Sequence, residues 1–479
     1  MRSPAVRIRA ALAKPSWSVH LSTMFQPEVI AIPGQLPAFP ERNAVFVANL
    51  LGLFFGNDEQ TRMLAEEVGE IDSYGGRLIP IVNLMFPGAA SNLLVLEREP
   101  DAHLCRYFTE TAGLSLPEQL VLPHKDYLSI GRALAGGKAI NHELIAVLEE
   151  HPSAFVQGYV TDPTLSRLAT ATGKTTISTA EGSHLGNNKR ALHQHLESIG
   201  LPIVKTELAA SPGEIPACLE RLRLAGFTSG VVKSAIGASG IGLTKIDSLS
   251  DTDISPVPEN FFFEGSCLVQ GWLKPGEFGI TEIRSPSVQL FLDDDSINLF
   301  DITEQILSHS SVHEGNEAPP YYLADRPELR SELLHQAGEA ARWLHAQGYR
   351  GTGSVDFLVA DHDNDSTVAY VCEINARVTG ATYPSVLARH FIPDGAWLMR
   401  NLRFEKPLTG EELLQMLRDS GDLFIPGETG AGLLPINFNF GPDGLVHKGQ
   451  FLCLAHSAAG SHVLLELAEL DLPCTPERD

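Results

Sequence analysis

The sequence predicts a multidomain protein: an α/β N-terminal domain with a parallel sheet, an α+β region and a small C-terminal domain. Strand-like and helix-like stretches alternate up to about residue 184, which is typical of parallel strands joined by helices. Beyond that point, several apolar runs are paired across short polar turns, which favours antiparallel strands. The length of 479 residues accommodates two to four domains, each with its own core.

The N-terminal domain is expected to span residues 1–184. Buried strands are predicted at 43–50 and 76–84, with a helix within 57–75 between them. A further strand followed by a helix is predicted at 153–173. This alternation predicts the parallel sheet.

The central region, residues 185–405, is expected to begin with a helix that starts near Asn188 and stops at Gly200. The remaining elements predicted there are helices at 212–227 and 327–349, strands on either side of a glycine-rich loop at 229–246, strands at 265–273, 276–284, 351–360 and 367–376, and a hairpin at 286–307. The C-terminal domain, 406–479, is expected to hold a short helix and two strands.

The composition is that of an ordinary soluble globular protein, with 43% apolar and 20% charged residues. The net charge of −24 argues against a general nucleic-acid binder, which needs a basic surface. The six cysteines form no close pairs, so neither a zinc knuckle nor a disulfide framework is expected. Free cysteines are typical of a reducing compartment, so a cytoplasmic location is expected. The longest apolar runs contain Asn, Gly or Pro, so no membrane span is expected. The first 27 residues form a basic tail with Arg2, Arg7, Arg9 and Lys14.

A lysine and a glycine-rich loop form the first candidate site. Lys233 ends an apolar strand, and Gly237, Ser239, Gly240 and Gly242 follow it. Glycines let backbone N–H groups approach a ligand oxygen, and a neighbouring lysine supplies the positive charge that phosphates need. The alternative is a plain hairpin turn with a lysine that reaches into solvent.

A strand with three different polar groups forms the second candidate site. Glu373, Asn375 and Arg377 alternate with apolar residues, so a strand would carry them on one face. Antiparallel pairing with the preceding strand would bring Asp356 to that face. Carboxylate and amide oxygens suit Mg²⁺, and Arg377 could stabilise charge on a transferring phosphoryl group. The alternative is a solvated strand face on which Arg377 neutralises Glu373.

In this order and spacing, the motifs of residues 185–405 resemble the ATP-grasp superfamily. Lys189 and Lys233 match the two lysines that hold the nucleotide phosphates in that family. Glu277 matches the family's following Gly-Glu pair. The segment that matches the adenine-reading linker consists of Gln270, Gly271, Trp272 and Leu273. Gln270 stands where the family usually has an acid.

The resemblance also implies roles for the second candidate site. Asp356, Glu373 and Asn375 match the magnesium ligands, and Arg377 matches the arginine near the acyl phosphate. The implied activity is a ligase that uses ATP and Mg²⁺ to phosphorylate a carboxylate and then lets an amine displace the phosphate.

The arrangement of domains is most similar to the pheganomycin-type peptide ligases, which attach an amino acid to the N-terminus of a peptide. The implied partners are therefore an amino acid and an amine or peptide acceptor, in secondary metabolite biosynthesis, with the oligomeric state open. A carboxylase-type enzyme, another small-molecule carboxylate ligase and a non-catalytic nucleotide-binding protein stay open as alternatives. His193 and His195 show no metal-ligand spacing and are expected to be surface or packing residues.

Overall fold

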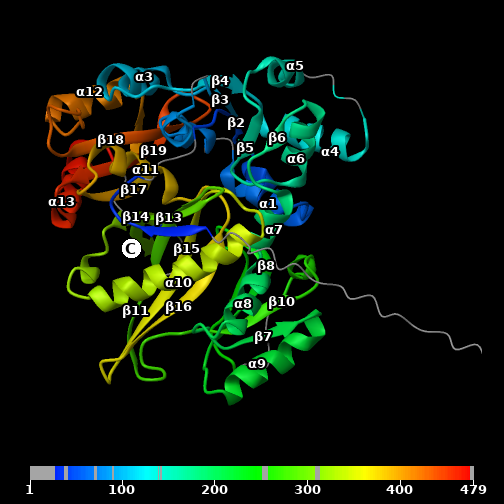
Figure 1. Ribbon diagram of the computed structural model, residues 1–479. Helices are drawn as coiled ribbons and strands as arrows, with labels where there is room; N and C mark the ends of the chain where they lie inside the picture. The colour runs from blue at the N-terminus through cyan, green and yellow to red at the C-terminus, as the bar shows by residue number, and fades with distance from the viewer. Residues whose placement is uncertain are drawn as a thin grey trace, which may run out of the picture.

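The computed structural model describes residues 27–36, 41–69, 73–88, 91–138, 140, 143–250, 257–307 and 313–474 (Figure 1). The predicted basic tail, including Arg2 and Arg7, lies outside these residues. Three sheets organise the described chain, with five, four and ten strands. Within the described residues, no helix is both long and apolar enough to cross a membrane.

The N-terminal region contains the predicted parallel sheet, in the order β4-β3-β2-β5-β6. Its strands are β2 (Ala44–Val47), β3 (Leu93–Leu96), β4 (Glu118–Val121), β5 (Phe155–Gly158) and β6 (Thr175–Thr176). Its helices are η1 (Leu50–Gly52), α1 (Asp58–Val68), η2 (Gly75–Leu78), α2 (Val82–Met85), α3 (Ala102–Arg106), η3 (Tyr107–Thr111), α4 (His124–Ala135), α5 (Glu143–Glu150), α6 (Pro163–Ala171) and α7 (Ala180–Gly186). Every registered strand pair in this sheet is parallel, which confirms the predicted class.

One predicted strand of this region is wrong. The stretch 76–84 folds as η2 and α2 instead of a strand. Leu78 and Ile81 are nevertheless fully buried. Periodicity cannot distinguish a short buried helix from a short buried strand, so the pattern indicated burial correctly and conformation incorrectly.

A small antiparallel sheet follows, in the order β7-β10-β8-β9 (Figure 1, lower right). Its strands are β7 (Thr206–Ala209), β8 (Gly230–Ala238), β9 (Ile241–Ile246) and β10 (Cys267–Gly271), and its helices are α8 (Lys189–Ser198), η4 (Pro212–Glu214), α9 (Ile215–Leu224) and η5 (Glu259–Phe262). The Asn188 side chain accepts a hydrogen bond from the Ala191 N–H at 3.1 Å, which caps α8 where the sequence predicted its start. Cys218, Leu219 and Leu222 of α9 pack against this sheet.

The ten-stranded sheet follows the order β11-β15-β12-β13-β14-β17-β19-β18, with β16 beside β15 and β1 beside β13. Its strands are β1 (Glu28–Ala31), β11 (Ile280–Arg284), β12 (Pro286–Leu292), β13 (Ser296–Leu307), β14 (His313–Ala318), β15 (Gly351–His362), β16 (Thr367–Asn375), β17 (Ala396–Leu408), β18 (Gly432–Phe440) and β19 (Val446–Ala455). Its helices are η6 (Tyr321–Leu323), α10 (Pro327–Ala346), α11 (Thr382–Phe391), α12 (Gly410–Ser420) and α13 (Ala458–Asp471). Antiparallel registers confirm the hairpin of β12 with β13 and that of β15 with β16.

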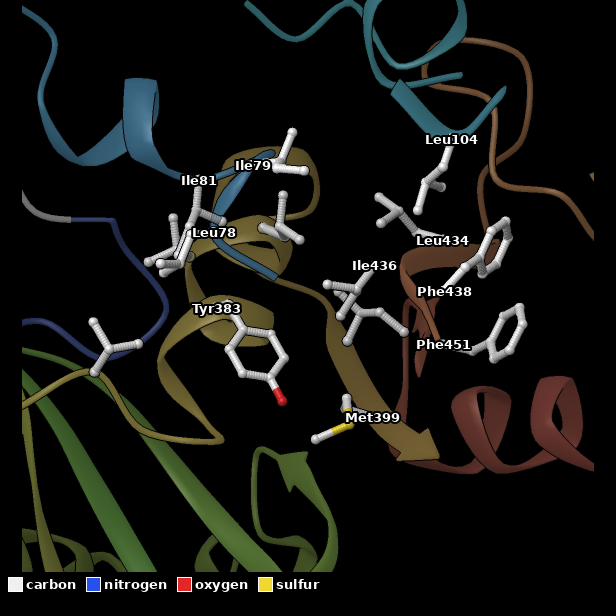
Figure 2. Close-up of a cluster of buried hydrophobic side chains, with 14 of the residues drawn as sticks. Leu78, Ile79, Ile81, Leu104, Tyr383, Met399, Leu434, Ile436, Phe438 and Phe451 are labelled. Atoms are coloured by element: carbon white, nitrogen blue, oxygen red, sulfur yellow. The ribbon is translucent and has the colours of Figure 1, made fainter. Parts of the chain in front are cut away.

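Two cores hold this sheet. Helix α10, which confirms the helix predicted within 327–349, buries Leu333, Ala337 and Leu344 against one face. A second core joins the N-terminal region to the end of the chain, and Figure 2 shows Leu78 and Ile81 in the same cluster as Ile436. Strand β17 crosses residue 405 and pairs with β19, so the predicted C-terminal segment shares a sheet with the central region. The proposed domain boundaries themselves stay a prediction.

Candidate nucleotide and metal site

Two carboxylates face each other across the β15–β16 hairpin. Asp356 is the register partner of Glu373, and Ser354 is the partner of Asn375. The predicted approach of Asp356 to the face of Glu373 is therefore confirmed. The alternation predicted that Arg377 lies on the same strand as Glu373 and Asn375. This is wrong, because β16 ends at Asn375 and Arg377 lies in the segment that follows.

Asp356 and Asn375 share a small hydrogen-bond network. The Asp356 carboxylate accepts from Ser287 Oγ at 2.6 Å, Ser354 Oγ at 3.1 Å and Asn375 Nδ2 at 2.9 Å. Asn375 is buried, and its Oδ1 atom has no hydrogen-bond partner among the described residues. A buried amide oxygen without a partner is costly unless a ligand contacts it, so this atom fits a site for a cation.

The electrostatics of the two carboxylates differ. Burial, and after it the charge of Glu373, raises the pKa of Asp356 to about 6. Burial also opposes ionisation of Glu373, but the nearby charges of Lys189 and Arg377 outweigh it and lower the pKa of Glu373 to about 2. The site therefore holds one firmly ionised acid beside another whose charge is disfavoured without a cation.

Lys189 connects helix α8 to strands β8 and β16 beside this site. Its Nζ atom lies 2.7 Å from Glu373 Oε2 and donates to the Gly237 carbonyl at 3.1 Å. The cap of α8 places Lys189 in the first helical turn, where its side chain contacts β8 through Gly237 and β16 through Glu373. Just before α8, Asn187 Oδ1 accepts from Arg377 Nη1, while Asn187 Nδ2 donates to the Ala376 carbonyl at 3.1 Å. Lys189, Glu373 and Arg377 are thus brought together, as predicted.

Lys233 lies on the small sheet, where its partner is an amide. Its Nζ atom donates to Gln270 Oε1 at 2.9 Å, and Gln270 Nε2 donates to Thr206 Oγ1 at 2.8 Å. Burial lowers the pKa of Lys233. Because Gln270 is neutral, it orients the ammonium group without cancelling its charge.

A narrow cleft lies between α8, the small sheet and β16. It is lined by Lys189, Leu192, His193, Leu196, Ile203, Val204, Lys233, Leu268, Gln270, Val371 and Cys372. The sequence prediction missed His193, although it lies four residues after Lys189 and hence on the same helix face. His195 stacks on Trp343 with ring centroids 5.5 Å apart, as a packing residue would.

Several other predicted nucleotide contacts do not line this cleft. Of the predicted linker, Gly271, Trp272 and Leu273 do not line it. The Lys245 ammonium lies 5.0 Å from the Trp272 ring. Glu277 accepts from Thr228 Oγ1 and lies 3.2 Å from Lys274 Nζ.

Two different structural requirements explain the glycines of the β8–β9 hairpin. Gly240 has a φ of +80° with open space around it, and Ser239 beside it has a φ of +52°, so both form the tight turn. Gly237 and Gly242 are required by close packing, because a Cβ at Gly237 would lie 2.6 Å from the Ile241 carbonyl oxygen and one at Gly242 would collide with Ser234 Oγ.

Within the described residues, no three His, Cys, Asp or Glu side chains gather as a metal-binding group. The candidate metal site instead combines two acids with one amide, as in the predicted set of Asp356, Glu373 and Asn375. That donor set is all oxygen, which suits a hard cation such as Mg²⁺.

No family model matches the chain. A search of curated proteins finds a 29% identical match over 199 residues to the "[Butirosin acyl-carrier protein]–L-glutamate ligase" of Niallia circulans. The match covers 41% of this chain and 44% of that protein, so the chain spans less than half of its curated relative.

Solved structures resemble the chain over nearly its whole length. The biotin carboxylase domain of Hydrogenobacter thermophilus 2-oxoglutarate carboxylase has a TM-score of 0.54 at 13% identity, covering 90% of each chain. Biotin carboxylase from Campylobacter jejuni has a TM-score of 0.54 at 12% identity, covering 90% of this chain and 92% of that one. The purK N5-carboxyaminoimidazole ribonucleotide synthetase has a TM-score of 0.50 at 14% identity, covering 90% and 97%. These solved structures are ATP-grasp proteins, and the chain shares their fold.

Proposed function

We propose that this protein is an ATP-dependent carboxylate–amine ligase. The γ-phosphoryl group of ATP passes to a substrate carboxylate, which gives an acyl phosphate and ADP. The nitrogen of an amine then attacks the acyl carbon, the bond to phosphate breaks and the nitrogen loses a proton, so an amide and inorganic phosphate form. The proposal rests on Lys189, which lines the cleft and contacts both Glu373 and the Gly237 carbonyl.

The two lysines serve the nucleotide in this proposal. Lys189 and Lys233 both line the cleft, on opposite elements, so a polyphosphate between them meets positive charge from two sides. The structural relatives support this reading, since the purK structure is a complex with ADP and the Campylobacter jejuni structure is a complex with β-γ-ATP. The roles of Gly271, Trp272, Leu273 and Glu277 toward adenosine stay predictions.

Asp356, Glu373 and Asn375 would hold the magnesium ion. Bound there, Mg²⁺ supplies charge neutralisation for the phosphate oxygens. The residues themselves prepare that site: the Asn375 amide oxygen is left without a protein partner, and the Asp356 carboxylate is oriented by two serine hydroxyls. When a cation is bound, the unfavourable charge of Asp356 becomes favourable.

Arg377 would orient the reacting carboxylate. Its guanidinium is restrained by Asn187, immediately before α8, so its position is set by the same segment that positions Lys189. A planar guanidinium can donate two hydrogen bonds to a carboxylate or to an acyl phosphate. It stabilises the negative charge that develops as phosphate leaves.

The substrates proposed are an amino acid carboxylate and an amine carried by a peptide or protein. The name of the Niallia circulans relative places L-glutamate on an acyl-carrier protein, which supports an amino acid donor and a macromolecular acceptor. The likeness to carboxylases concerns the fold and does not favour a carboxylation.

The test is a screen of amino acids with amine or peptide acceptors. ADP and phosphate are measured together, and the product is identified by mass spectrometry. The expected result is ADP release that requires both substrates and a product whose mass equals their sum minus water. ATP consumption that ignores acceptors, or no binding of ATP, would overturn the proposal.

A further inference from the structure

A buried glutamine of the N-terminal region contacts the glycine-rich hairpin. Gln60 lies on α1, is 1% exposed, and its Nε2 atom donates to Ser234 Oγ at 3.1 Å. Ser234 directly follows Lys233 in β8. The contact joins residues 174 positions apart in the chain.

Ser234 in turn shapes the hairpin. Its hydroxyl donates to the Ile236 carbonyl at 2.5 Å while accepting from Gln60, so both of its hydrogen-bonding roles are used. The β8–β9 register shifts between Lys233 and Ala238, and the Ser234 hydroxyl lies inside this irregular stretch. The absence of a side chain at Gly242 makes room for that hydroxyl.

A second contact joins the cap of the same helix to η5. Asn57 caps α1 by accepting from the Gln60 N–H at 3.2 Å, and its Nδ2 donates to the Asn260 carbonyl at 3.1 Å. Helix α1 and its cap therefore contact β8 next to Lys233 and also contact η5. At the tip of the hairpin the space beside Gly240 is open, because a Cβ added there would meet nothing within 4 Å.

We propose that Gln60 is a positioning residue for nucleotide binding, through which the N-terminal region holds the glycine-rich hairpin and Lys233 against the phosphates. This inference rests on the proposed function of the cleft. A hairpin ordered before ATP arrives loses less conformational freedom on binding, so its support strengthens binding without touching the ligand. Gln60 acts through Ser234 and does not itself reach the cleft.

The test uses the full chain with four variants. Gln60→Met keeps the length and bulk of the side chain but removes the donor, and Ser234→Ala removes the acceptor. The double variant closes a thermodynamic cycle, and Glu66→Gln, an exposed position on the same helix, is the control. Binding of a non-hydrolysable ATP analogue with Mg²⁺ is measured by calorimetry, and hydrogen exchange is followed in peptides covering 230–246.

Loss of one buried hydrogen bond predicts about fivefold weaker analogue binding in Gln60→Met, and a similar acceleration of exchange in the hairpin. The parallel sheet should exchange as in the control, and the double variant should be no worse than Ser234→Ala alone. Unchanged binding and exchange in Gln60→Met, or additive losses in the double variant, would overturn the inference. If the wild-type chain binds no nucleotide, the proposed function fails, while hairpin exchange still decides whether Gln60 restrains the hairpin.

Discussion

Replacement of Asp356 by Asn should show that the charged Asp356 carboxylate lowers the free energy of unfolding at neutral pH. The pKa of Asp356 is raised from 3.8 to about 6, chiefly by burial, so the folded protein holds this proton more tightly than the unfolded chain does. A raised carboxyl pKa lowers stability as the pH rises, beginning near the unfolded value and ending just above the folded one. Wild-type stability should therefore fall from about pH 4 to about pH 7 on account of this group.

The magnitude follows from the shift. A pKa shift of one unit corresponds to somewhat more than about 1 kcal/mol, and roughly half of the shift of Asp356 takes effect between pH 5 and pH 8, so the expected change is roughly 1 kcal/mol. The amide introduced by Asp356→Asn would not titrate, so the difference in unfolding free energy, variant minus wild type, should rise by that amount over this range. Constant effects of the substitution, such as altered hydrogen bonds to Ser287 and Asn375, cancel in this comparison.

The assay is thermal and denaturant unfolding at pH 5, 6.5 and 8 with a chelator present. Asp363→Asn, an exposed carboxyl at the tip of the same hairpin, is the matched control and should show no such trend. Added Mg²⁺ with an ATP analogue should stabilise the wild type and not the Asp356→Asn variant. A stability difference that stays constant from pH 5 to pH 8, or falls, would refute the reasoning.

Three further predictions concern single residues. Glu373→Ala should remove turnover while leaving the circular dichroism spectrum unchanged, and an unaltered rate would contradict the metal assignment. Lys189→Met should weaken binding of an ATP analogue by about tenfold or more, because a charged hydrogen-bond donor is lost, whereas Lys205→Met, which is half exposed, should not; calorimetry decides. Arg389→Met should lower the free energy of unfolding by about 3–5 kcal/mol, because it leaves the buried Asp301 carboxylate without its cationic partner. That carboxylate lies 3.0 Å from Arg389 Nη2 and 3.1 Å from Trp397 Nε1. A change near zero in urea unfolding would contradict this prediction.

Local signals made much of the fold predictable. The start of α8 follows from Asn188 as a capping residue, and its end follows from Gly200, whose φ is +75°. The β15–β16 hairpin and its facing acids follow from a period of two. The stretch 76–84 was predicted wrongly because its apolar residues are buried in either conformation.

The site was predictable only where its residues lie on regular elements. Asp356 and Glu373 meet because the strand register brings them together, and Lys189 follows from the helix start. Arg377 lies beyond its strand and is held by Asn187, a tertiary contact across 190 residues that no local pattern encodes. Gln60 is of the same kind, since nothing in the sequence of α1 points to Ser234.

The pairing of strand β1 has a consequence for the synthesis of this protein and for the design of truncated fragments. It pairs in parallel with Ser296–Leu299 of β13, while β14 pairs with β13 farther along, from Glu304 to Leu307. Both strands thus lie against β13, and β1 covers its first part although it is synthesised more than 260 residues earlier. During translation β1 must wait unpaired until β13 has emerged from the ribosome. A fragment limited to residues 185–405 would expose the backbone of β13 where β1 belongs, and that of β17 where β19 belongs. The central region, although it carries the candidate nucleotide and metal site, therefore depends on both flanking segments to close its sheet.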